Sequence, residues 1–552
     1  MIKVRLARDT DAPAIAEIFQ ATYGAAYAYP EFYDPYELKR LIFADDTVVV
    51  VAEEVDGGRV VGTASVLEEK GAYTDLGGEF GRLAVHPDFR HRGVGQLLIE
   101  KRLELVKDRL HVGIMEARIV NPYSTKIATA HGFTTVGYLP GKLMIEWREN
   151  LALLVRHFGD ALELRRNHPR VIPEAYRVTS AALKGCSLEC DAIVDEESTS
   201  YPHRDDFVLE ELTTEGYAAL LRIQRGRVKS RHVFGPMRLH YGYFKLKAKD
   251  SHYLLAKDRG DIVGAVGYTH DEREGIVIVF EMISLQDDVI RFLITELLRR
   301  CETEMGAQYV EVDVSAYAPR MQRTFLEFGF LPVAYVPALV FHKVERLDVV
   351  KMGRLYARLD TSREVLIPDV QPLADLVISS FQRRQVEPRI REAIDRIDLF
   401  KGLNEEQQQR VARFCEPQRY APGETIFEAD ASAGEIHLVL SGDVDVYVGH
   451  PRARVGSVRE GESLGEVSAL SGVAHSASAV ARDQVETAVL SHESLESLIR
   501  RRPDVGVVLY RNLATGLGEK LQRSDLALLE KQGVAALRRS RTRSPGRDRL
   551  RT

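Results

Sequence analysis

The chain has 552 residues and is too long for one hydrophobic core, since single cores stop growing at roughly 250–300 residues, so we expect three or four domains. Its apolar content of 45% and charged content of 28% are ordinary for globular proteins, and no apolar stretch reaches the roughly 20 residues that a membrane span needs. The net charge of −6, the four scattered cysteines and the absence of a signal-peptide pattern together predict a cytoplasmic protein that binds neither membrane, DNA nor metal.

Residues 1–150 alternate strand-like and helical patterns, which favours a domain of the α/β class. The apolar face of the first helix is predicted at 12–19, and a further helical stretch at 151–166. Strands are predicted at 47–52, 59–66, 81–85 and 114–120.

Two patterns recur along the chain. The pair Gly-Phe followed by Tyr-x-Pro at 132–140 returns at 329–337, an offset of 197 residues, and Val-Gly at 61–62 returns at 263–264, an offset of 202. A repeat of this length predicts two copies of one fold, the second over residues 176–345.

The last third of the chain has a different sequence pattern. Residues 346–393 are helical in character with proline-bearing breaks, and we expect them to form a connector. Short β-rich runs punctuated by glycine at 394–515 suit a small antiparallel barrel with flanking helices. A closing helix is predicted at about 503–532, and the arginine-rich stretch 533–552 is predicted to be a disordered tail.

The segment 81–98 is predicted to be a strand, a glycine-bearing turn and a helix start. Glycines 93 and 95 remove side chains so that backbone N–H groups can approach a phosphate, and the helix N-terminus adds partial positive charge. Taken alone, Arg-x-x-Gly-x-Gly fits an ordinary turn equally well. With the strand, the leucine-bearing helix and the Asn…Gly-Phe pattern downstream, residues 1–148 resemble the GCN5-related N-acetyltransferase (GNAT) superfamily.

The resemblance implies acetyl-coenzyme A as cofactor. Backbone groups of the strand, at Leu83, Ala84 and Val85, would bind the pantetheine arm. Asn121 would contact the cofactor, although it serves equally well as a cap for the helix that follows. The pyrophosphate would be held by Arg90, His91, Arg92, Gly93, Val94, Gly95 and Gln96.

The resemblance also supplies a candidate base. A protonated amine must lose its proton before it can attack a thioester, and Glu79 stands where protein-acetylating members place a glutamate. The alternative for Glu79 is a solvated carboxylate at a strand end. The family often has a tyrosine, which protonates the departing thiolate, at the position of Ala128. No residue of this chain is an obvious general acid, and Tyr123, Tyr138 or water remain candidates.

The second copy is predicted not to bind the cofactor. It has no glycine pair where the phosphate loop should be, and the acidic pair Asp287-Asp288 would repel a pyrophosphate. We expect a structural role in covering an edge of the first domain or shaping a wall of the substrate cleft, and Glu281 is given no role.

Residues 394–515 resemble the cyclic-nucleotide-binding domain of catabolite activator protein and of protein kinase A regulatory subunits. The resemblance implies that Gly465, Glu466 and Val467 would meet the ribose and phosphate of cyclic AMP or cyclic GMP. Where the family has an arginine for the phosphate, this chain has His475 and Ser476, so ligand sensing and a fold kept for docking or homo-oligomer contacts both remain open. No helix-turn-helix follows.

The predicted architecture is therefore a multidomain α/β (α+β) chain of two GNAT-like mixed-sheet domains followed by a cyclic-nucleotide-binding β-barrel of the jelly-roll kind. The function expected from these resemblances is transfer of an acetyl group from acetyl-CoA to an amine, either a protein lysine or a small molecule. The alternative is a signalling protein that senses acetyl-CoA or a cyclic nucleotide without turnover.

Overall fold

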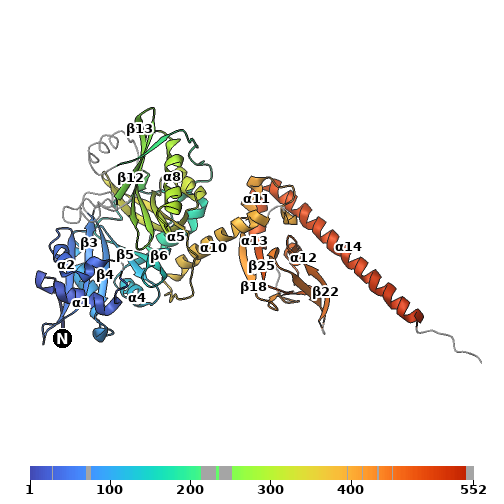
Figure 1. The fold of residues 1–552 in the computed structure, drawn as a ribbon, viewed down its shortest axis with the longest axis horizontal. Helices are drawn as coiled ribbons and strands as arrows, with labels where there is room; N and C mark the ends of the chain where they lie inside the picture. The colour runs from blue at the N-terminus through green and yellow to red at the C-terminus, as the bar shows by residue number, and fades with distance from the viewer. Residues whose placement is uncertain are drawn as a thin grey trace, which may run out of the picture. The chain divides into compact units, whose positions relative to one another are not determined.

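The computed structural model describes residues 1–27, 29–69, 76–212, 232–234, 251–393, 396–412, 414–431, 434–449 and 452–541. The chain forms two units, Met1–Ile378 and Ser379–Thr552 (Figure 1). Within the described ranges, no helix combines the length and the apolar character needed to cross a membrane.

The first unit contains two stretches, which we call the first half and the second half, and the order of strands and α-helices from β2 to β7 in the first recurs from β12 to β17 in the second. The first half runs through β1 (Ile2–Leu6), η1 (Asp9–Asp11), α1 (Ala12–Tyr23), η2 (Pro30–Tyr33), α2 (Pro35–Ile42), β2 (Thr47–Glu54), β3 (Val60–Glu69), β4 (Gly77–Val85), η3 (Pro87–Phe89), α3 (Val94–Val106), β5 (Val112–Arg118), α4 (Tyr123–Ala130), β6 (Thr134–Met144) and β7 (Arg148–His157). After β8 (Arg170–Val171), α5 (Pro173–Gly185) and β9 (Ile193–Val194), the second half runs through β10 (Val208–Glu211), β11 (Val233–Phe234), β12 (Ser251–Asp258), β13 (Asp261–Asp271), β14 (Ile276–Ser284), α8 (Val289–Thr303), β15 (Tyr309–Ser315), α9 (Pro319–Glu327), β16 (Leu331–His342) and β17 (Glu345–Leu355).

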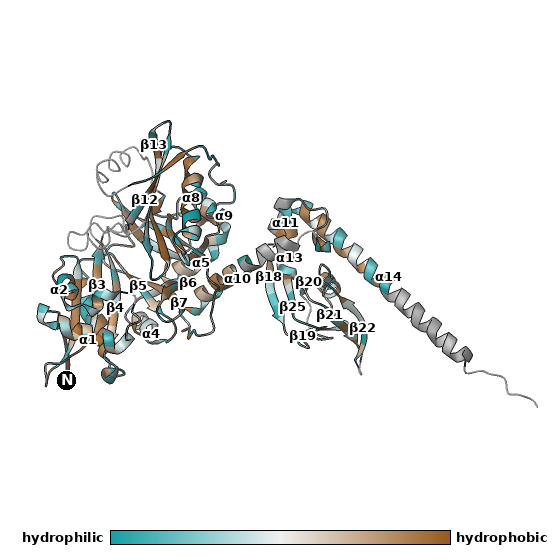
Figure 2. Cartoon of the chain, viewed as in Figure 1, coloured by the Kyte–Doolittle hydropathy of each residue, from teal (hydrophilic) through white to brown (hydrophobic). Residues whose placement is uncertain are grey.

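The two halves share one sheet, which has fifteen strands among the described residues. Its order is β1-β2-β3-β4-β5-β7-β6-β16-β17-β15-β14-β13-β12-β10, with β11 beside β15, so the second half repeats the first in reverse across the sheet. The halves meet where Gly137 of β6 pairs with Ala334 of β16. A Cβ on Gly137 would lie 2.1 Å from that of Ala334, so only glycine permits this approach. In Figure 2 the strands are largely brown, whereas helices such as α8 show teal and brown sides.

Helices cover both faces of the first half. Helix α1 packs its apolar residues, among them Ile15 and Phe19, against Val49 and Val51 of β2. Helix α3 covers the other face and approaches β3 closely, because a Cβ on Gly62 would lie 3.0 Å from Val94 Cγ1. The same contact recurs in the second half between Gly264 and Val289, at 2.8 Å, which matches the start of α8 to the start of α3.

The prediction of a helix at 151–166 is wrong, because Arg148–His157 form strand β7. Residues 149–155 of this strand are buried, and the unbroken apolar run at 151–155 fits a strand covered on both faces as well as a buried helix. The helical connector predicted from residue 346 is wrong over 346–355, which belong to β17. There the charged Asp348 and Lys351 are buried with ion-pair partners, so the strand does not show an apolar pattern. The helix of this region is α10 (Gln371–Ala393).

The second unit is β-rich, as expected. Two four-stranded sheets, β18-β25-β20-β23 and β19-β24-β21-β22 among the described residues, enclose a small core around Val439 and Val444. Helix α14 includes 533–541, so the predicted tail is helical there, while 542–552 lie outside the described residues. The elements are η5 (Asp398–Phe400), α11 (Glu405–Ala412), β18 (Cys415–Tyr420), β19 (Thr425–Phe427), β20 (Glu435–Ser441), β21 (Val444–Val448), β22 (Ala453–Val458), β23 (Ser463–Leu464), α12 (Glu466–Ser471), β24 (Ser478–Ala481), β25 (Val485–Ser491), α13 (His492–Arg501) and α14 (Pro503–Arg541).

Candidate active site

Strands β4 and β5 separate part-way along their length. They run parallel and pair at Gly77–Glu79 with Val112–Ile114, but β4 continues to Val85 and β5 to Arg118. Beyond Glu79, β4 stays bonded to β3 and β5 to β7. Backbone groups on one edge of β4 therefore have no strand partner among the described residues, and such an edge can bind an extended ligand.

A bulge in β4 lies at this edge. The register with β3 shifts between Thr63 and Ser65, and Arg82 has a φ of 54°, a left-handed conformation that is unusual for a side-chain-bearing residue. Arg102 of α3 lies fully buried beneath the bulge, where its Nη1 donates to the carbonyls of Ser65 (3.1 Å) and Gly81 (3.3 Å). Burial lowers the pKa of Arg102 to about 9. This residue, which the sequence reading missed, holds the bulge in place.

The glycine-bearing turn leads into the N-terminus of α3. Gly93 is the N-cap residue, with a φ of 76°, and His91 also has a positive φ of 61°. The first N–H groups of a helix have no partner inside it, so this end of a 13-residue helix can bind an anion. Arg90, His91, Arg92, Gly93 and Gln96 are exposed there, as the sequence predicts, whereas the Val94 side chain is buried.

The other predicted cofactor residues lie near this turn. Leu83, Ala84 and Val85 belong to the end of β4, with the Ala84 side chain buried. Gly95 faces α4, since a Cβ there would lie 3.1 Å from Ile127 Cδ1. Asn121 Oδ1 accepts a hydrogen bond from the Tyr123 backbone N–H at 3.3 Å, from the position before the N-cap residue Pro122, and its contact with a cofactor stays a prediction.

The candidate acids differ in their surroundings. Tyr138 is fully buried and its hydroxyl donates to Glu364, so it is not available to protonate a thiolate. Tyr123 is 56% exposed and its ring lies 5.4 Å from that of His91, on the phosphate turn. Ala128 is fully buried in α4.

Glu79 faces the side of the sheet that carries α1. It is paired in register with Leu67, which packs in the α1 core, and its carboxylate lies 3.0 Å from Arg82 Nη2. The side chain is 35% exposed, so water can reach it. The position suits a base that acts through water, although the role itself stays a prediction.

An aromatic wall, defined as Tyr23, Tyr27 and Tyr29, stands on the same side. Its ring centroids lie 4.9 Å apart for Tyr23 and Tyr27 and 5.5 Å apart for Tyr27 and Tyr29. Burial raises the pKa of Tyr27. The positive charge of Arg82 opposes this rise and the negative charge of Glu79 adds to it, so both side chains act on the Tyr27 phenol. Burial also raises the pKa of Tyr23, and the positive charges of Arg118 and Arg90 oppose that rise. Sequence reading missed this wall, and the run of tyrosines at 23–33 was the signal for it.

The described residues of the second half show no comparable cradle. Only residues 285–288 separate β14 from α8, whereas 86–93 separate β4 from α3. Asp287 pairs with Arg320 at 2.6 Å, and Asp288 lies 3.4 Å from Arg204. Glu281 is buried and accepts a hydrogen bond from the Tyr253 hydroxyl at 2.6 Å. The acidic pair therefore occupies the place where the first half offers arginines and a glycine.

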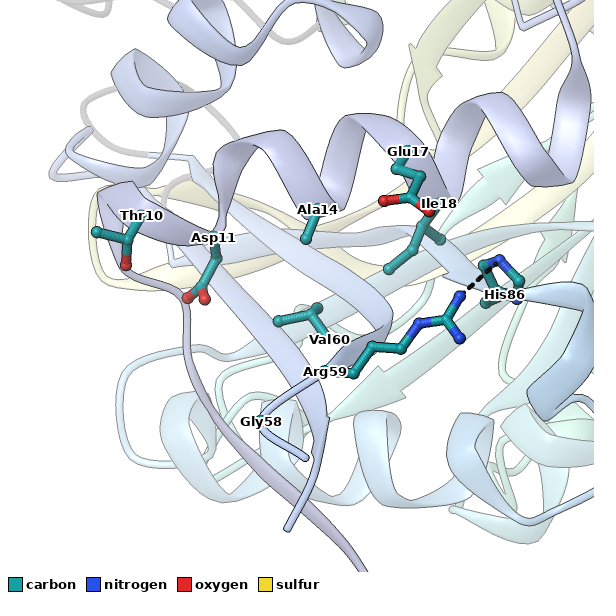
Figure 3. A pocket seen from close by; sticks show the side chains of 9 residues that line it. All are labelled: Thr10, Asp11, Ala14, Glu17, Ile18, Gly58, Arg59, Val60 and His86. Carbon is teal, nitrogen blue, oxygen red and sulfur yellow. Dashed lines mark hydrogen bonds between the residues drawn. The ribbon is translucent and has the colours of Figure 1, made fainter. Parts of the chain in front are cut away.

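A separate cavity of about 240 Å³ opens on the α1 face of the first half (Figure 3). Figure 3 shows Arg59 and His86 pointing toward each other, joined by a 3.3 Å contact, with Glu17 nearby on α1. Its lining does not include Glu79 or residues 90–96, so we do not assign the predicted chemistry to it. The cavity is lined by Thr10, Asp11, Ala14, Glu17, Ile18, Gly58, Arg59, Val60 and His86.

In the second unit, the predicted nucleotide residues do lie together. Gly465, with a φ of 83°, precedes α12, and Glu466 is 4% exposed. His475 Nδ1 lies 3.0 Å from Oγ of Ser468 in α12, and the His475 ring stacks on the Phe427 ring with the centroids 4.0 Å apart. Burial lowers the pKa of His475, which favours a neutral ring. Val467 and Ser476 are exposed.

Helix α14 also contacts this pocket, which the sequence did not indicate. Lys520 Nζ pairs with the Glu466 carboxylate and donates to the Ser463 carbonyl. One turn further on, Arg523 pairs with Glu462 at 2.7 Å. The carboxylate expected to hold a ribose is therefore already engaged by an ammonium group of the same chain.

Comparisons with known proteins match a domain family to the region around each candidate site. Residues 44–134 match the family model of the acetyltransferase (GNAT) domain, and residues 417–502 match that of the cyclic nucleotide-binding domain. Both resemblances seen in the sequence are thereby confirmed.

Curated relatives match the C-terminal region. A cAMP-dependent protein kinase regulatory subunit of Colletotrichum orbiculare is 29% identical over 148 residues, which is 26% of this chain and 36% of that protein. The cyclic AMP receptor protein of Thermus thermophilus is 33% identical over 133 residues, which is 24% of this chain and 60% of that protein. The chain thus spans less than two thirds of either relative.

Among solved structures, a putative phosphinothricin N-acetyltransferase is 23% identical, with a TM-score of 0.26, and the alignment covers 29% of this chain and 99% of that one. A cyclic nucleotide-binding domain from Methylobacillus flagellatus is 24% identical, with a TM-score of 0.25, over 27% of this chain and 84% of that one.

Proposed function

Because the chain carries a GNAT acetyltransferase domain within residues 44–134 and a cyclic nucleotide-binding domain within 417–502, we propose that it is an N-acetyltransferase that transfers an acetyl group from acetyl-CoA to an amine. One observation carries the proposal. The edge of β4 that has no strand partner among the described residues is followed, after the turn at 86–93, by the glycine-capped N-terminus of α3. A strand edge for an amide-bearing arm, followed by a helix end for a pyrophosphate, suits coenzyme A.

The residues fit this cofactor. Arg90 and Arg92 supply cations beside the helix N-terminus, and Gly93 and Gly95 keep Cβ atoms away from the phosphate path. Leu83 and Val85 would hold the pantetheine arm through their backbone groups. Bound in this way, acetyl-CoA supplies the activated acyl group.

The proposed step is a direct transfer. The amine nitrogen attacks the thioester carbonyl carbon, the C–S bond breaks, and the nitrogen loses a proton through water to Glu79. The thiolate takes a proton from Tyr23, from Tyr123 or from water. Negative charge on the thioester oxygen would be stabilised by backbone N–H groups at the β4 bulge, which Arg102 holds in place.

Replacing Glu79 tests the proposal. Thiol release from acetyl-CoA with amine acceptors is expected to fall by at least about 10²-fold in Glu79→Gln, while the affinity for coenzyme A stays unchanged. Glu104→Gln is the matched control, because that exposed carboxylate of α3 pairs with Lys101 away from the β4 edge. Coenzyme A binding without turnover in the unaltered protein would favour the sensing alternative.

The C-terminal domain has a second proposed role, as a regulatory module for cyclic AMP or cyclic GMP. The support is the position of Glu466 and His475 around α12. Because Lys520 engages Glu466, a nucleotide must displace an ammonium group before its ribose can reach that carboxylate. A fold kept for docking or homo-oligomer contacts is the alternative for this domain.

A further inference from the structure

The turn between β13 and β14 brings one carboxylate of the second half, Glu274, to the first half. Arg148 of β7 ties the turn in place, since its Nη1 donates to Gly141 O at 2.7 Å and its Nη2 to Glu274 O at 2.6 Å. The side chain of Glu274 reaches the aromatic wall, where the Tyr29 hydroxyl donates to Oε2 at 3.4 Å. The second half thus contributes a residue to the face that carries Glu79.

Glu274 is 5% exposed, and its Oε1 has no hydrogen-bond partner within the described part of the chain. A buried polar atom without a partner costs free energy, so its presence calls for a physical explanation. The charges around it do not compensate. Burial and the carboxylates of Asp271 and Glu116 raise the pKa of Glu274 to about 7, against the opposing charge of Lys142.

Other carboxylates of this region already have a cation. Glu79 lies 3.0 Å from Arg82, and Glu149 lies 2.6 Å from Arg118. Lys142 lies 2.5 Å from Glu116 and 3.0 Å from Glu311, so its ammonium group is committed to those two. Buried carboxylates are normally paired in this way. Of these carboxylates, Glu274 is the one for which the described residues show no ion pair, although Arg148, which bonds its backbone carbonyl, interacts with its charge.

We propose that Glu274 binds an ammonium group of the acceptor that does not react, so that the acceptor is a small diamine or polyamine. The inference rests on the proposed acetyl transfer and names its substrate class. The reacting nitrogen is not the one bound here, because a carboxylate beside it would stabilise the ammonium form and oppose the loss of its proton. An ammonium group has three donors, enough for Oε1 and the Tyr29 oxygen, and Tyr29 supplies an aromatic ring beside the cation.

The proposal also explains what the second half does. Its described residues show no phosphate cradle, and in this proposal its β13–β14 turn would complete an acceptor site of the first half. A protein lysine has one cationic nitrogen, and that nitrogen is the one that reacts. A diamine brings a second ammonium group on a narrow alkyl chain, and because Glu274 is 5% exposed a bulkier acceptor would reach it less easily.

Calorimetric titration of the full chain, saturated with coenzyme A, tests this inference without turnover. We expect 1,4-diaminobutane to bind at least about 10-fold more tightly than butylamine, and Glu274→Gln to remove that preference. Glu281→Gln is the matched control, since Glu281 lies on the same hairpin and is equally buried against a tyrosine hydroxyl, that of Tyr253. It is expected to keep the preference.

A second measurement does not depend on a variant that folds. An ammonium group beside Glu274 lowers the pKa of that carboxyl, so at pH 6.5 diaminobutane should release protons on binding and butylamine should not. The release appears as a dependence of the binding heat on the ionisation enthalpy of the buffer. Equal affinities of the two amines, a preference retained in Glu274→Gln, or no proton release would each overturn the inference.

Turnover assays separate the two proposals. Selective binding of diaminobutane without acetyl transfer would support the Glu274 site and sink the acetyltransferase function. Equal acetylation of butylamine and diaminobutane, with equal affinities, would support the function and sink the site.

Discussion

The first and second halves of the large sheet repeat one order of elements from β2 and from β12 onward, but they differ where β4 and β14 meet the following helix. In the first half, residues 86–93 form a turn that ends in a left-handed glycine, Gly93. In the second half, residues 285–288 make a shorter link that contains Asp287 and Asp288, each near an arginine. The packing beside this junction is nevertheless the same, with Gly62 against Val94 and Gly264 against Val289.

The comparison shows that the scaffold does not depend on the cradle. A strand, a helix and a glycine that lets them approach are enough to keep the fold, whereas phosphate binding needs a longer link with glycine and cations. The second half keeps the scaffold and contributes instead a side chain at the seam, Glu274.

The largest effect is expected from replacing the link between β4 and α3 with the shorter link between β14 and α8. With residues 86–93 replaced by Leu-Gln-Asp-Asp, the first half loses Arg90, Arg92 and the left-handed glycine cap. Several charge-assisted hydrogen bonds, each worth roughly 1.5–3 kcal/mol, are lost, so affinity for coenzyme A should fall by about 10³-fold or more. Calorimetric titration measures this, with thermal unfolding to check the fold. A variant that folds and still binds the coenzyme would show that the cradle lies elsewhere.

Replacing Glu274 is expected to change how the stability of the protein depends on pH. The pKa of this carboxyl is raised from 4.5 to about 7, so the folded state holds its proton more tightly than the unfolded state. Its contribution to stability is therefore present below pH 4.5 and is lost as the pH rises through 7. At 1.36 kcal/mol per pKa unit, Glu274→Gln should be more stable than the unaltered protein by up to about 3 kcal/mol at pH 8, and equal to it near pH 4.

Urea unfolding at several pH values measures this difference in the free energy of unfolding. The control is Glu104→Gln, an exposed carboxylate that should leave the pH dependence unchanged. A difference that is constant with pH would mean that Glu274 does not titrate in this range.

The sequence predicted the cradle because its signal is local, with two glycines, two arginines and a helix start within seven residues. Glu79 and the nucleotide residues were placed through family resemblance, and Glu466 and His475 do lie together. Strand β7 and the start of β17 were missed because burial on both faces, or buried ion pairs, hides the alternation of a strand. Glu274, Arg102 and Lys520 act across contacts of 21 residues or more, which no local pattern reveals.

Arg102 offers a smaller test of the same comparison. It lies eight residues after Val94, and the residue eight after Val289 is Leu297, which is buried in α8. Arg102→Leu removes the donors to Ser65 O and Gly81 O, so the bulge in β4 should shift and acetyl transfer should slow by about 10-fold, or 1.4 kcal/mol. Steady-state kinetics with coenzyme A binding as the control measures it. Unchanged turnover in a folded variant would leave Arg102 without a part in positioning the bulge.

The predicted nucleotide residues of the C-terminal domain extend the comparison to a carboxylate that is present but already paired. Unlike the second half, the C-terminal domain retains its glycine and carboxylate, Gly465 and Glu466, but Lys520 of α14 pairs with that carboxylate. Lys520→Ala should therefore free Glu466 for a ribose, and His475→Arg should add a charged partner for the phosphate, because a guanidinium can stack on Phe427 as the imidazole does.

At a cyclic AMP concentration of ten times the Kd of the double variant, binding would stabilise that variant by about 1.4 kcal/mol. At the same concentration we expect a smaller gain in Lys520→Ala and the smallest gain in the unaltered protein. Thermal unfolding with and without the nucleotide measures the series. Arg523→Ala is the matched control, because Arg523 lies on the same helix but pairs with Glu462. An equal shift in all variants would show that Lys520 does not compete with the ligand, and no shift even in the double variant would leave this domain as a docking module.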